Sequence, residues 1–262
     1  MVAKRLASDS GEPALRIYLA GGIAVVGSNG TAVGEAAFAG RQARRLFARL
    51  VAIHEPVPIA DLADDLWGPE WPPAWQVALR SLVSKLRTTL GRVGAAEALA
   101  SANGAYALAL PAGVWLDLDE ASAAMHRAEA ALAAGDHLAA AAEALVARSI
   151  ASRTLLPGEE AEWLDLLRAR LTEVRLRALE SLGEVWIARG DPALAARDAA
   201  EAIRVDPYRE RAHRLLIRAH IAAGDRGAAA QAYEACRRLL AEELGVEPSS
   251  ETRALVASVL RS

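Results

Sequence analysis

Short apolar runs open the chain and are separated by turn signals. Residues 14–33 (ALRIYLAGGIAVVGSNGTAV) contain two such signals, Gly21-Gly22 and Asn29-Gly30. Apolar runs bounded by glycine and Asn-Gly pairs are typical of strands joined by tight turns. The pattern therefore predicts a small β-sheet at the start of the fold.

The spacing of apolar residues then changes to that of a helix. The positions that recur at helical spacing are Ala43, Leu46, Phe47, Leu50 and Val51. The opposite face carries Arg41, Arg44, Arg45 and Arg49. The helix must end near Pro56 and Pro58, because proline lacks a backbone N–H and crowds the preceding turn.

Two more helices and a hairpin are predicted next. Residues 59–67 (IADLADDLW) form a short helix, followed by a stiff loop that holds Gly68, Pro69, Pro72 and Pro73. A third helix covers about residues 74–90 and ends at Gly91. In residues 98–110, Asn103-Gly104 lies between apolar runs, which is a strong β-hairpin signal.

The third predicted helix has two very different faces. Its buried stripe on a helical wheel comprises Leu79, Leu82, Val83, Leu86 and Leu90. The opposite face holds Val77, Ser81, Ser84 and Thr88, flanked by Arg80, Lys85 and Arg87. Between Trp71 and Ala96 there is no acidic residue.

Such a face suits the major groove of DNA. The groove admits a helix, short hydroxyl side chains allow close approach, and Lys and Arg pair with phosphate or guanine. A solvated face with scattered cations is the alternative. The preceding helices and the following hairpin favour DNA binding, because together they make a helix-turn-helix with a wing.

The rest of the chain predicts paired helices in tandem repeats. Gly190-Asp191 and Gly224-Asp225 lie 34 residues apart, and in that register Ala178 aligns with Ala212 and Ala195 with Ala229. This period with small residues between paired helices is typical of tetratricopeptide repeats. Residues 133–145 predict a third such turn, displaced by an insertion around residues 153–163.

The resulting fold class is mainly α, with a small β-sheet and a hairpin wing in its first part. We expect three regions: a disordered lead-in (1–13), a winged-helix DNA-binding domain (14–112) and an all-α tetratricopeptide-like domain (113–262). Charge differs between the last two. Residues 1–112 carry eleven Lys or Arg against nine Asp or Glu, whereas residues 113–262 carry nineteen against twenty-four.

Composition excludes several classes of function. No apolar run approaches the roughly 18 residues of a membrane span, so we expect a cytoplasmic protein without a membrane partner. The sequence contains no G-x-x-x-x-G-K-[ST] or G-x-G-x-x-G motif for binding phosphates and no H-E-x-x-H motif for binding zinc. The single cysteine, Cys236, lies among apolar helix positions and is expected to be buried. We therefore expect no catalytic site, no metal and no cofactor, and we expect the six tryptophans to be mostly core residues.

The order of these motifs resembles a known family. The segments LADDLWG (62–68), WPP (71–73), ALRSLVSKLRTTLG (78–91), NGAYALAL (103–110) and ALAARDAAEAIRVDPYRERAHRLLIRAHIAAGDRGAAAQAYEACRRLLAEELGVEPSSETRAL (193–255) carry the resemblance. Together they resemble the SARP-type antibiotic regulatory proteins, in which an OmpR-type winged helix precedes a bacterial transcriptional activator domain. Ala105 in the wing and the bulky Trp75 at the start of the third helix depart from the family pattern.

The resemblance implies a function and two sets of contact residues. Such regulators bind promoter direct repeats as pairs and recruit RNA polymerase through its sigma factor. The candidate DNA contacts are Arg80, Ser81, Ser84, Lys85, Arg87 and Thr88, with Arg44 and Asn103 as outlying members. The candidate polymerase contacts are Asp64, Asp65 and Glu70, which lie beside the predicted DNA-reading helix.

We therefore interpret the chain as a sequence-specific DNA-binding regulator, and as an activator. The partners would be double-stranded DNA and the sigma factor, with a homodimer forming on DNA. The alternative is a tetratricopeptide adaptor that binds proteins and whose winged helix no longer binds DNA. For the arginines of the first helix and the acidic residues of the second, an ordinary solvated surface remains open.

Overall fold

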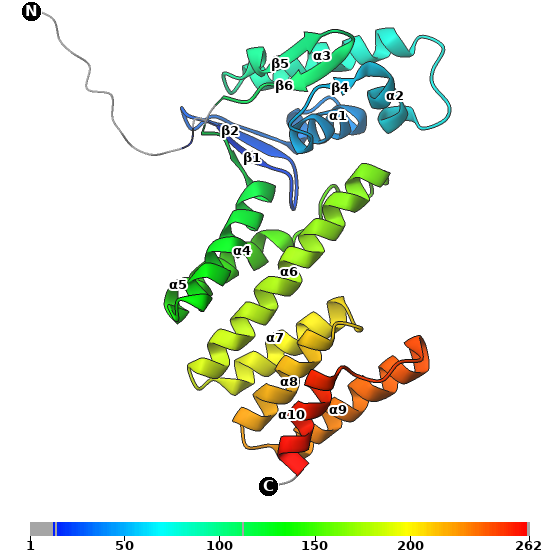
Figure 1. The fold of residues 1–262 in the computed structure, drawn as a ribbon. Helices are drawn as coiled ribbons and strands as arrows, with labels where there is room; N and C mark the ends of the chain where they lie inside the picture. Colours follow the sequence, from blue (N-terminus) through cyan, green and yellow to red (C-terminus); the bar gives the residue numbers. More distant parts are fainter. Residues whose placement is uncertain (1–12, 14, 112, 261–262) are drawn as a thin grey trace, which may run out of the picture. The chain divides into compact units, whose positions relative to one another are not determined.

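The computed structural model describes residue 13, residues 15–111 and residues 113–260 (Figure 1). The expected lead-in, residues 1–13, lies outside this range except for Pro13. Contacts divide the chain into two compact units. The first holds the described residues up to Asp117 together with Thr154–Asp165, and the second holds the remainder. No helix among the described residues is long and apolar enough to cross a membrane.

The predicted β-sheet at the start of the fold is confirmed. It contains β1 (Leu15–Tyr18), β2 (Ala24–Gly27), β3 (Ala32–Gly34) and β7 (Trp115–Leu116) in the order β3-β2-β1-β7. Strands β1 and β2 are antiparallel, with buried Ile17 opposite buried Val25. Strand β7 joins β1 in parallel. Gly21 and Gly30 have positive φ angles, so both turns use the backbone conformation that glycine allows.

Three helices pack into the core of the same unit, as the spacing predicted. They are α1 (Arg41–Ala52), α2 (Ile59–Trp67) and α3 (Trp75–Gly91), with a short 3₁₀ turn before α1, η1 (Glu35–Ala37). Leu46, Phe47, Leu62, Leu79 and Leu86 are all at most 2% exposed. The core therefore lies where the apolar stripes of the three helices meet.

The predicted hairpin is also present. Strands β5 (Leu99–Ala102) and β6 (Ala105–Leu108) follow a 3₁₀ turn, η2 (Ala96–Ala98), and β6 also pairs with β4 (Val57–Pro58). Asn103 and Gly104 have φ angles of 52° and 73°. Positive φ at both central residues is the requirement of the type I′ turn that Asn-Gly favours.

A segment from far along the sequence completes the first unit. Thr154–Asp165 lies there although helical regions precede and follow it. Leu155 forms an antiparallel bridge with Ala20, and the Thr154 carbonyl accepts a 3.0 Å hydrogen bond from the Gly21 N–H. The expected domain of residues 14–112 thus differs from this unit, because the insertion packs on the sheet.

Asp117 joins the end of β1 to the start of helix α4 (Asp117–Ala133). Its buried carboxylate accepts hydrogen bonds from the backbone N–H groups of Leu19 and Ala20, both at 2.9 Å. Asp117 is also the first residue of α4. The Asp117 carboxylate also binds a strand end almost a hundred residues earlier, so it holds the sheet in place.

The second unit is all helical and shows the predicted repeat. Its helices are α4 (Asp117–Ala133), α5 (His137–Ala151), α6 (Glu162–Ala188), α7 (Pro192–Val205), α8 (Glu210–Ala222), α9 (Arg226–Leu239) and α10 (Ser250–Leu260), with a π-helical turn, η3 (Leu240–Leu244), after α9. Gly135, Gly190 and Gly224 have φ angles of 78°, 81° and 76° at the three turns between paired helices.

Small residues fill the spaces between the paired helices. Ala178, Ala195, Ala212 and Ala229, the residues aligned by the 34-residue period, are all 0% exposed. Two of the Gly-Asp turns also cap the next helix. Asp225, for example, accepts a 2.8 Å hydrogen bond from the Ala228 N–H.

The burial of Cys236 was predicted correctly from the sequence, but the burial of the tryptophans was not. Cys236 is fully buried, as expected, and burial raises the pKa of its thiol to about 11. The expectation that the tryptophans are mostly core is wrong. Only Trp163 is buried, at 9% exposed, while Trp71 is 36% exposed and the other four are intermediate. An indole ring carries a polar N–H on an apolar body, so it tolerates this partial exposure.

Candidate nucleic-acid interface

Helix α3 presents the two faces that its sequence predicted. Its apolar stripe from Leu79 to Leu90 is at most 8% exposed, whereas Val77 on the opposite side is 64% exposed. The candidate DNA contacts on α3 are all exposed: Arg80, Ser81, Ser84, Lys85, Arg87 and Thr88. Lys85 and Arg80 form no ion pair with a described residue, so their charges are available to a ligand.

Two of these candidate residues also have structural contacts. The guanidinium of Arg87 donates from Nε and Nη2 to the Leu99 carbonyl at 3.2 and 3.0 Å, which joins α3 to strand β5 of the hairpin. The Thr88 hydroxyl donates to the Ser84 carbonyl of its own helix at 3.1 Å. Arg87 thus joins the hairpin to α3, and Figure 1 shows β5 and β6 beside this helix.

Asn103 lies at the exposed tip of the hairpin. The base of the tip is fixed, because the Ile59 N–H donates to the Gly104 carbonyl at 3.0 Å and β4 pairs with β6. The hairpin is therefore supported from both the α3 side and the α2 side. Ala105, the departure from the family pattern, is the first residue of β6 and pairs with both Ala102 and Pro58.

The cationic face of α1 is engaged within the unit. Arg44 forms an ion pair with Glu35 at 3.2 Å, and Arg41 donates from Nε to Glu159 at 2.6 Å. Arg45 donates to the Glu160 carbonyl at 2.9 Å. The hydrogen bond to Glu159 raises the pKa of Arg41. Arg44 is thus engaged by Glu35, and no pattern in the sequence indicated that the 154–165 segment supplies the partners of Arg41 and Arg45.

The acidic candidates differ in how available they are. Asp65 forms an ion pair with Arg49, and the two side chains are only 17% and 14% exposed. Asp64 is exposed and accepts a 2.9 Å hydrogen bond from the Trp71 indole. Glu70 is exposed in the loop between α2 and α3. Asp64 and Glu70 are therefore the members of the set that a partner can reach.

An aromatic pair fixes the loop that precedes α3. The rings of Trp71 and Trp75 lie 4.7 Å apart at an interplanar angle of 61°, an edge-to-face contact. Trp75 is thus packed against Trp71 at the first turn of α3. The bulky side chain of Trp75, which departs from the family pattern, thus helps to hold the loop between α2 and α3.

Other chemistry has little support in the described part of the chain. No cluster of three or more His, Cys, Asp or Glu side chains there could hold a metal ion. His213 is buried, and its Nε2 lies 2.8 Å from the Pro207 carbonyl. The contact with Pro207 gives the His213 ring a structural role in the packing between α7 and α8.

The fold defines a class of protein: a winged helix-turn-helix joined to a helical-repeat unit, as found in bacterial transcriptional regulators. A family model, the bacterial transcriptional activator domain, matches residues 116–260. The chain belongs to the SARP family of transcriptional regulators that carry this domain.

Several relatives support this assignment. The regulatory protein AfsR of Streptomyces griseus is 32% identical over 209 residues, which is 77% of this chain and 20% of AfsR. The transcriptional regulatory protein EmbR of Mycobacterium tuberculosis is 30% identical over 222 residues, which is 79% of this chain and 54% of EmbR. The chain thus spans about a fifth of AfsR and about half of EmbR.

A solved structure is similar throughout. It is that of Mycobacterium tuberculosis EmbR in complex with a low-affinity phosphopeptide. It matches with a TM-score of 0.84 and 27% identity over 95% of this chain and 66% of that chain. The predicted fold class is therefore confirmed.

Proposed function

We propose that this protein is a cytoplasmic, sequence-specific DNA-binding activator that inserts α3 into the major groove. The observation that carries the proposal is the exposed face of α3. Short side chains lie along its middle, and the sequence from Trp71 to Ala96 has no carboxylate. At its borders lie the cations Arg80 and Lys85, which form no ion pair with a described residue. A helix of this kind approaches base edges closely and without repulsion from phosphates.

The hairpin and the pairing of molecules complete the proposed mode of binding. Asn103 at the tip of the hairpin would contact the backbone beside the groove, while Ser81, Ser84 and Thr88 face the bases or phosphates. Two copies would occupy direct repeats, as the family resemblance implies. Arg44 would contribute only if its ion pair with Glu35 opened, so it is the weakest member of the set.

The first test removes Lys85. Lys85→Ala should weaken binding to the upstream DNA of its own gene by about 1–3 kcal/mol, the usual worth of a base-directed contact. Fluorescence anisotropy at several stated salt concentrations measures this loss, with scrambled DNA as the non-specific reference. Arg170→Ala, which removes an exposed arginine of α6, is the matched control and should bind like the parent.

Arg87 should behave differently. As a phosphate contact, its loss should weaken binding to all sequences and lower the slope of log K against log salt by about 0.9. Unchanged footprints for both Lys85→Ala and Arg87→Ala would remove α3 from the interface. If the parent bound no DNA at all, the adaptor function would take its place.

We further propose that Asp64 and Glu70 contact the sigma factor of RNA polymerase. Both carboxylates are exposed beside α3, where negative charge disfavours DNA and favours a basic protein partner. Asp65 is the third predicted member, but its ion pair with Arg49 leaves little of it for a partner.

The test separates DNA binding from activation. The double variant Asp64→Asn, Glu70→Gln removes both charges and keeps an acceptor for the Trp71 indole. It should still bind promoter DNA but fail to stimulate transcription by purified polymerase. Glu97→Gln, which neutralises another exposed carboxylate of the same unit, is the control. Full activation by the double variant would place the polymerase contact elsewhere.

A further inference from the structure

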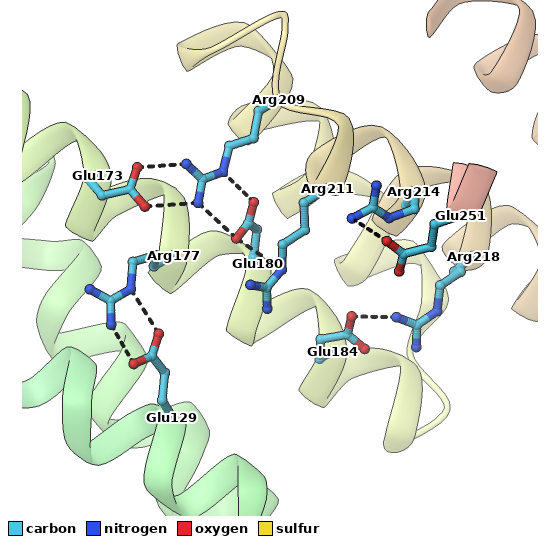
Figure 2. Close-up of polar contacts among 10 residues, drawn as sticks. All are labelled: Glu129, Glu173, Arg177, Glu180, Glu184, Arg209, Arg211, Arg214, Arg218 and Glu251. Atoms are coloured by element: carbon cyan, nitrogen blue, oxygen red, sulfur yellow. Dashed lines mark hydrogen bonds and ion pairs between the residues drawn. The ribbon is translucent and has the colours of Figure 1, made fainter. Parts of the chain in front are cut away.

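An acidic helical unit concentrates arginines on one exposed helix face. Residues 113–262 have more acidic than basic residues, nineteen Lys or Arg against twenty-four Asp or Glu. Helix α8 nevertheless carries Arg211, Arg214 and Arg218, spaced so that they follow one side of the helix (Figure 2). With a rise of about 1.5 Å per residue, the first and last are about 10 Å apart along the axis.

These arginines line two adjoining cavities within the second unit. One, of about 400 Å³, is lined by the three arginines with Glu184, Leu215, Glu251 and Leu255. The other, of about 490 Å³, shares Arg211, Arg218 and Glu184 and adds Leu132, His137, Ile187 and Ala188. Because they share three residues, the cavities adjoin each other, and we call the two together the α8 groove.

Neighbouring Arg209, in contrast, uses its hydrogen-bond donors for contacts within the fold. It makes two hydrogen bonds to Glu173, at 2.7 and 3.0 Å, and two to Glu180, at 2.6 and 3.2 Å. Its side chain is only 20% exposed. The hydrogen bond to Glu180 is the largest of the effects that raise the pKa of Arg209. Its donors are thus used inside the fold.

Two arginines of the groove are more exposed than Arg209. Arg211 is 57% exposed, and its only ion pair with a described residue is a 3.3 Å contact with Glu180, whose carboxylate Arg209 already binds. Arg218 is 42% exposed and pairs with Glu184. Arg214 is only 20% exposed and is held by a 3.2 Å hydrogen bond to Thr252 and a 3.2 Å ion pair with Glu251. The guanidinium groups of Arg211 and Arg218 therefore reach solvent, where a ligand carboxylate can compete for them.

We propose that the α8 groove binds an extended acidic segment of a partner protein. Arg211 and Arg218, at 57% and 42% exposed, supply the accessible positive charge of the groove. Leu132, Ile187 and Leu255 supply apolar contacts beside these charges. An extended chain rises about 3.1 Å per residue in polyproline II form, so carboxylates three residues apart match the separation of Arg211 and Arg218. The open, charged shape suits a peptide better than a small molecule, which needs an enclosing, mostly apolar pocket.

The experiment measures peptide binding to the full chain without DNA, so its result is independent of the proposed DNA binding. The probe is a fluorescein-labelled peptide of four Glu-Pro-Leu units, and the same peptide with glutamine in place of glutamate is its control. Anisotropy should show binding of the acidic peptide that weakens as KCl is raised. The glutamine peptide should bind at least tenfold more weakly.

Variants identify the site. Arg211→Gln with Arg218→Gln should weaken binding about tenfold, whereas Arg204→Gln, at an exposed arginine of α7, should leave it unchanged. Arg211→Gln alone removes only the 3.3 Å contact and serves if the double variant does not fold. Equal binding of both peptides, equal binding by the variants, or complete displacement of the peptide by inorganic phosphate at constant ionic strength would overturn the proposal.

Discussion

The substitution Gly183→Ala tests how closely the helices of the second unit pack. Gly183 lies in α6, and a Cβ atom at this position would be 2.3 Å from Cδ2 of Leu215 and 3.0 Å from its Cδ1 and Cγ. Leu215 belongs to α8 and is only 2% exposed. Its side chain must therefore move within a filled space to admit one methyl group.

Two opposing effects set the expected magnitude. Alanine is more favourable than glycine inside a helix by about 0.8–1.0 kcal/mol. Overpacking of a filled core costs about 1–3 kcal/mol. The second effect should prevail, because three atoms of a buried side chain lie at or within 3.0 Å. We expect a net loss of about 1 kcal/mol in the free energy of unfolding.

A second glycine provides a matched control. Gly227 lies in α9, and a Cβ there would meet only the Asp225 Oδ1, at 3.6 Å, which is ordinary contact. Gly227→Ala should therefore stabilise the protein by about 0.5–1 kcal/mol. Thermal unfolding followed by circular dichroism should separate the two variants by several degrees, since 1 kcal/mol corresponds to about 2–4 °C for a chain of this size.

A double-mutant cycle identifies the cause. When Leu215 is first replaced by alanine, the clash disappears, and Gly183→Ala should then be stabilising in that background. The reasoning is refuted if Gly183→Ala raises the melting temperature of the parent as much as Gly227→Ala does. That result would mean that α6 and α8 can separate without cost, and the α8 groove would then lack a fixed floor.

Three further predictions concern buried or partly buried polar groups. Cys236, with its thiol pKa raised to about 11 by burial, should not react with iodoacetamide at pH 8 until the protein is unfolded in urea. Burial favours the neutral acid at Glu210, but hydrogen bonds from Thr252 and Ser249 outweigh it and hold its pKa below the usual 4.5. This stabilisation is complete above pH 4.5 and is lost as the pH falls through the lower folded-state pKa, so urea titrations should show a smaller acid loss for Glu210→Gln. Asp117→Ala should cost about 2–4 kcal/mol by urea unfolding, because it leaves two buried N–H groups without their acceptor, and an unchanged midpoint would show that water replaces it.

Local signals in the sequence were sufficient for the elements of the fold. The stripe from Leu79 to Leu90 is periodic, so the wheel placed both the core side and the exposed side of α3 correctly. Asn103-Gly104 is a turn with one favoured conformation, and the hairpin follows from it. The 34-residue period aligned Ala178 with Ala212 because both occupy the same space between paired helices.

Contacts between distant residues had no such signal. Glu159 and Arg41 are 118 residues apart, and the sequence around neither residue predicts that they form a pair. The same holds for Asp65, which is acidic and on a short helix but pairs with Arg49 of another helix. A cationic or acidic face is visible in a sequence, but whether it is free or neutralised depends on which segments the fold brings together.

The position of the 154–165 segment affects how the chain can fold during synthesis. The ribosome makes β1, the three helices and the hairpin first, yet the bridge from Leu155 to Ala20 and the partners of Arg41 come later. Forty-eight residues separate Asp117 from Asp165, the last residue of the first unit. Because synthesis proceeds at about 5–20 residues per second, roughly 2–10 s pass before the final segment of the winged-helix unit has been made. During that interval Arg41 and Arg45 of α1 lack the partners that residues 158–160 later supply. The half-made winged helix therefore carries more uncompensated positive charge than the finished one, and release of the 154–165 segment from the ribosome is the step that removes it.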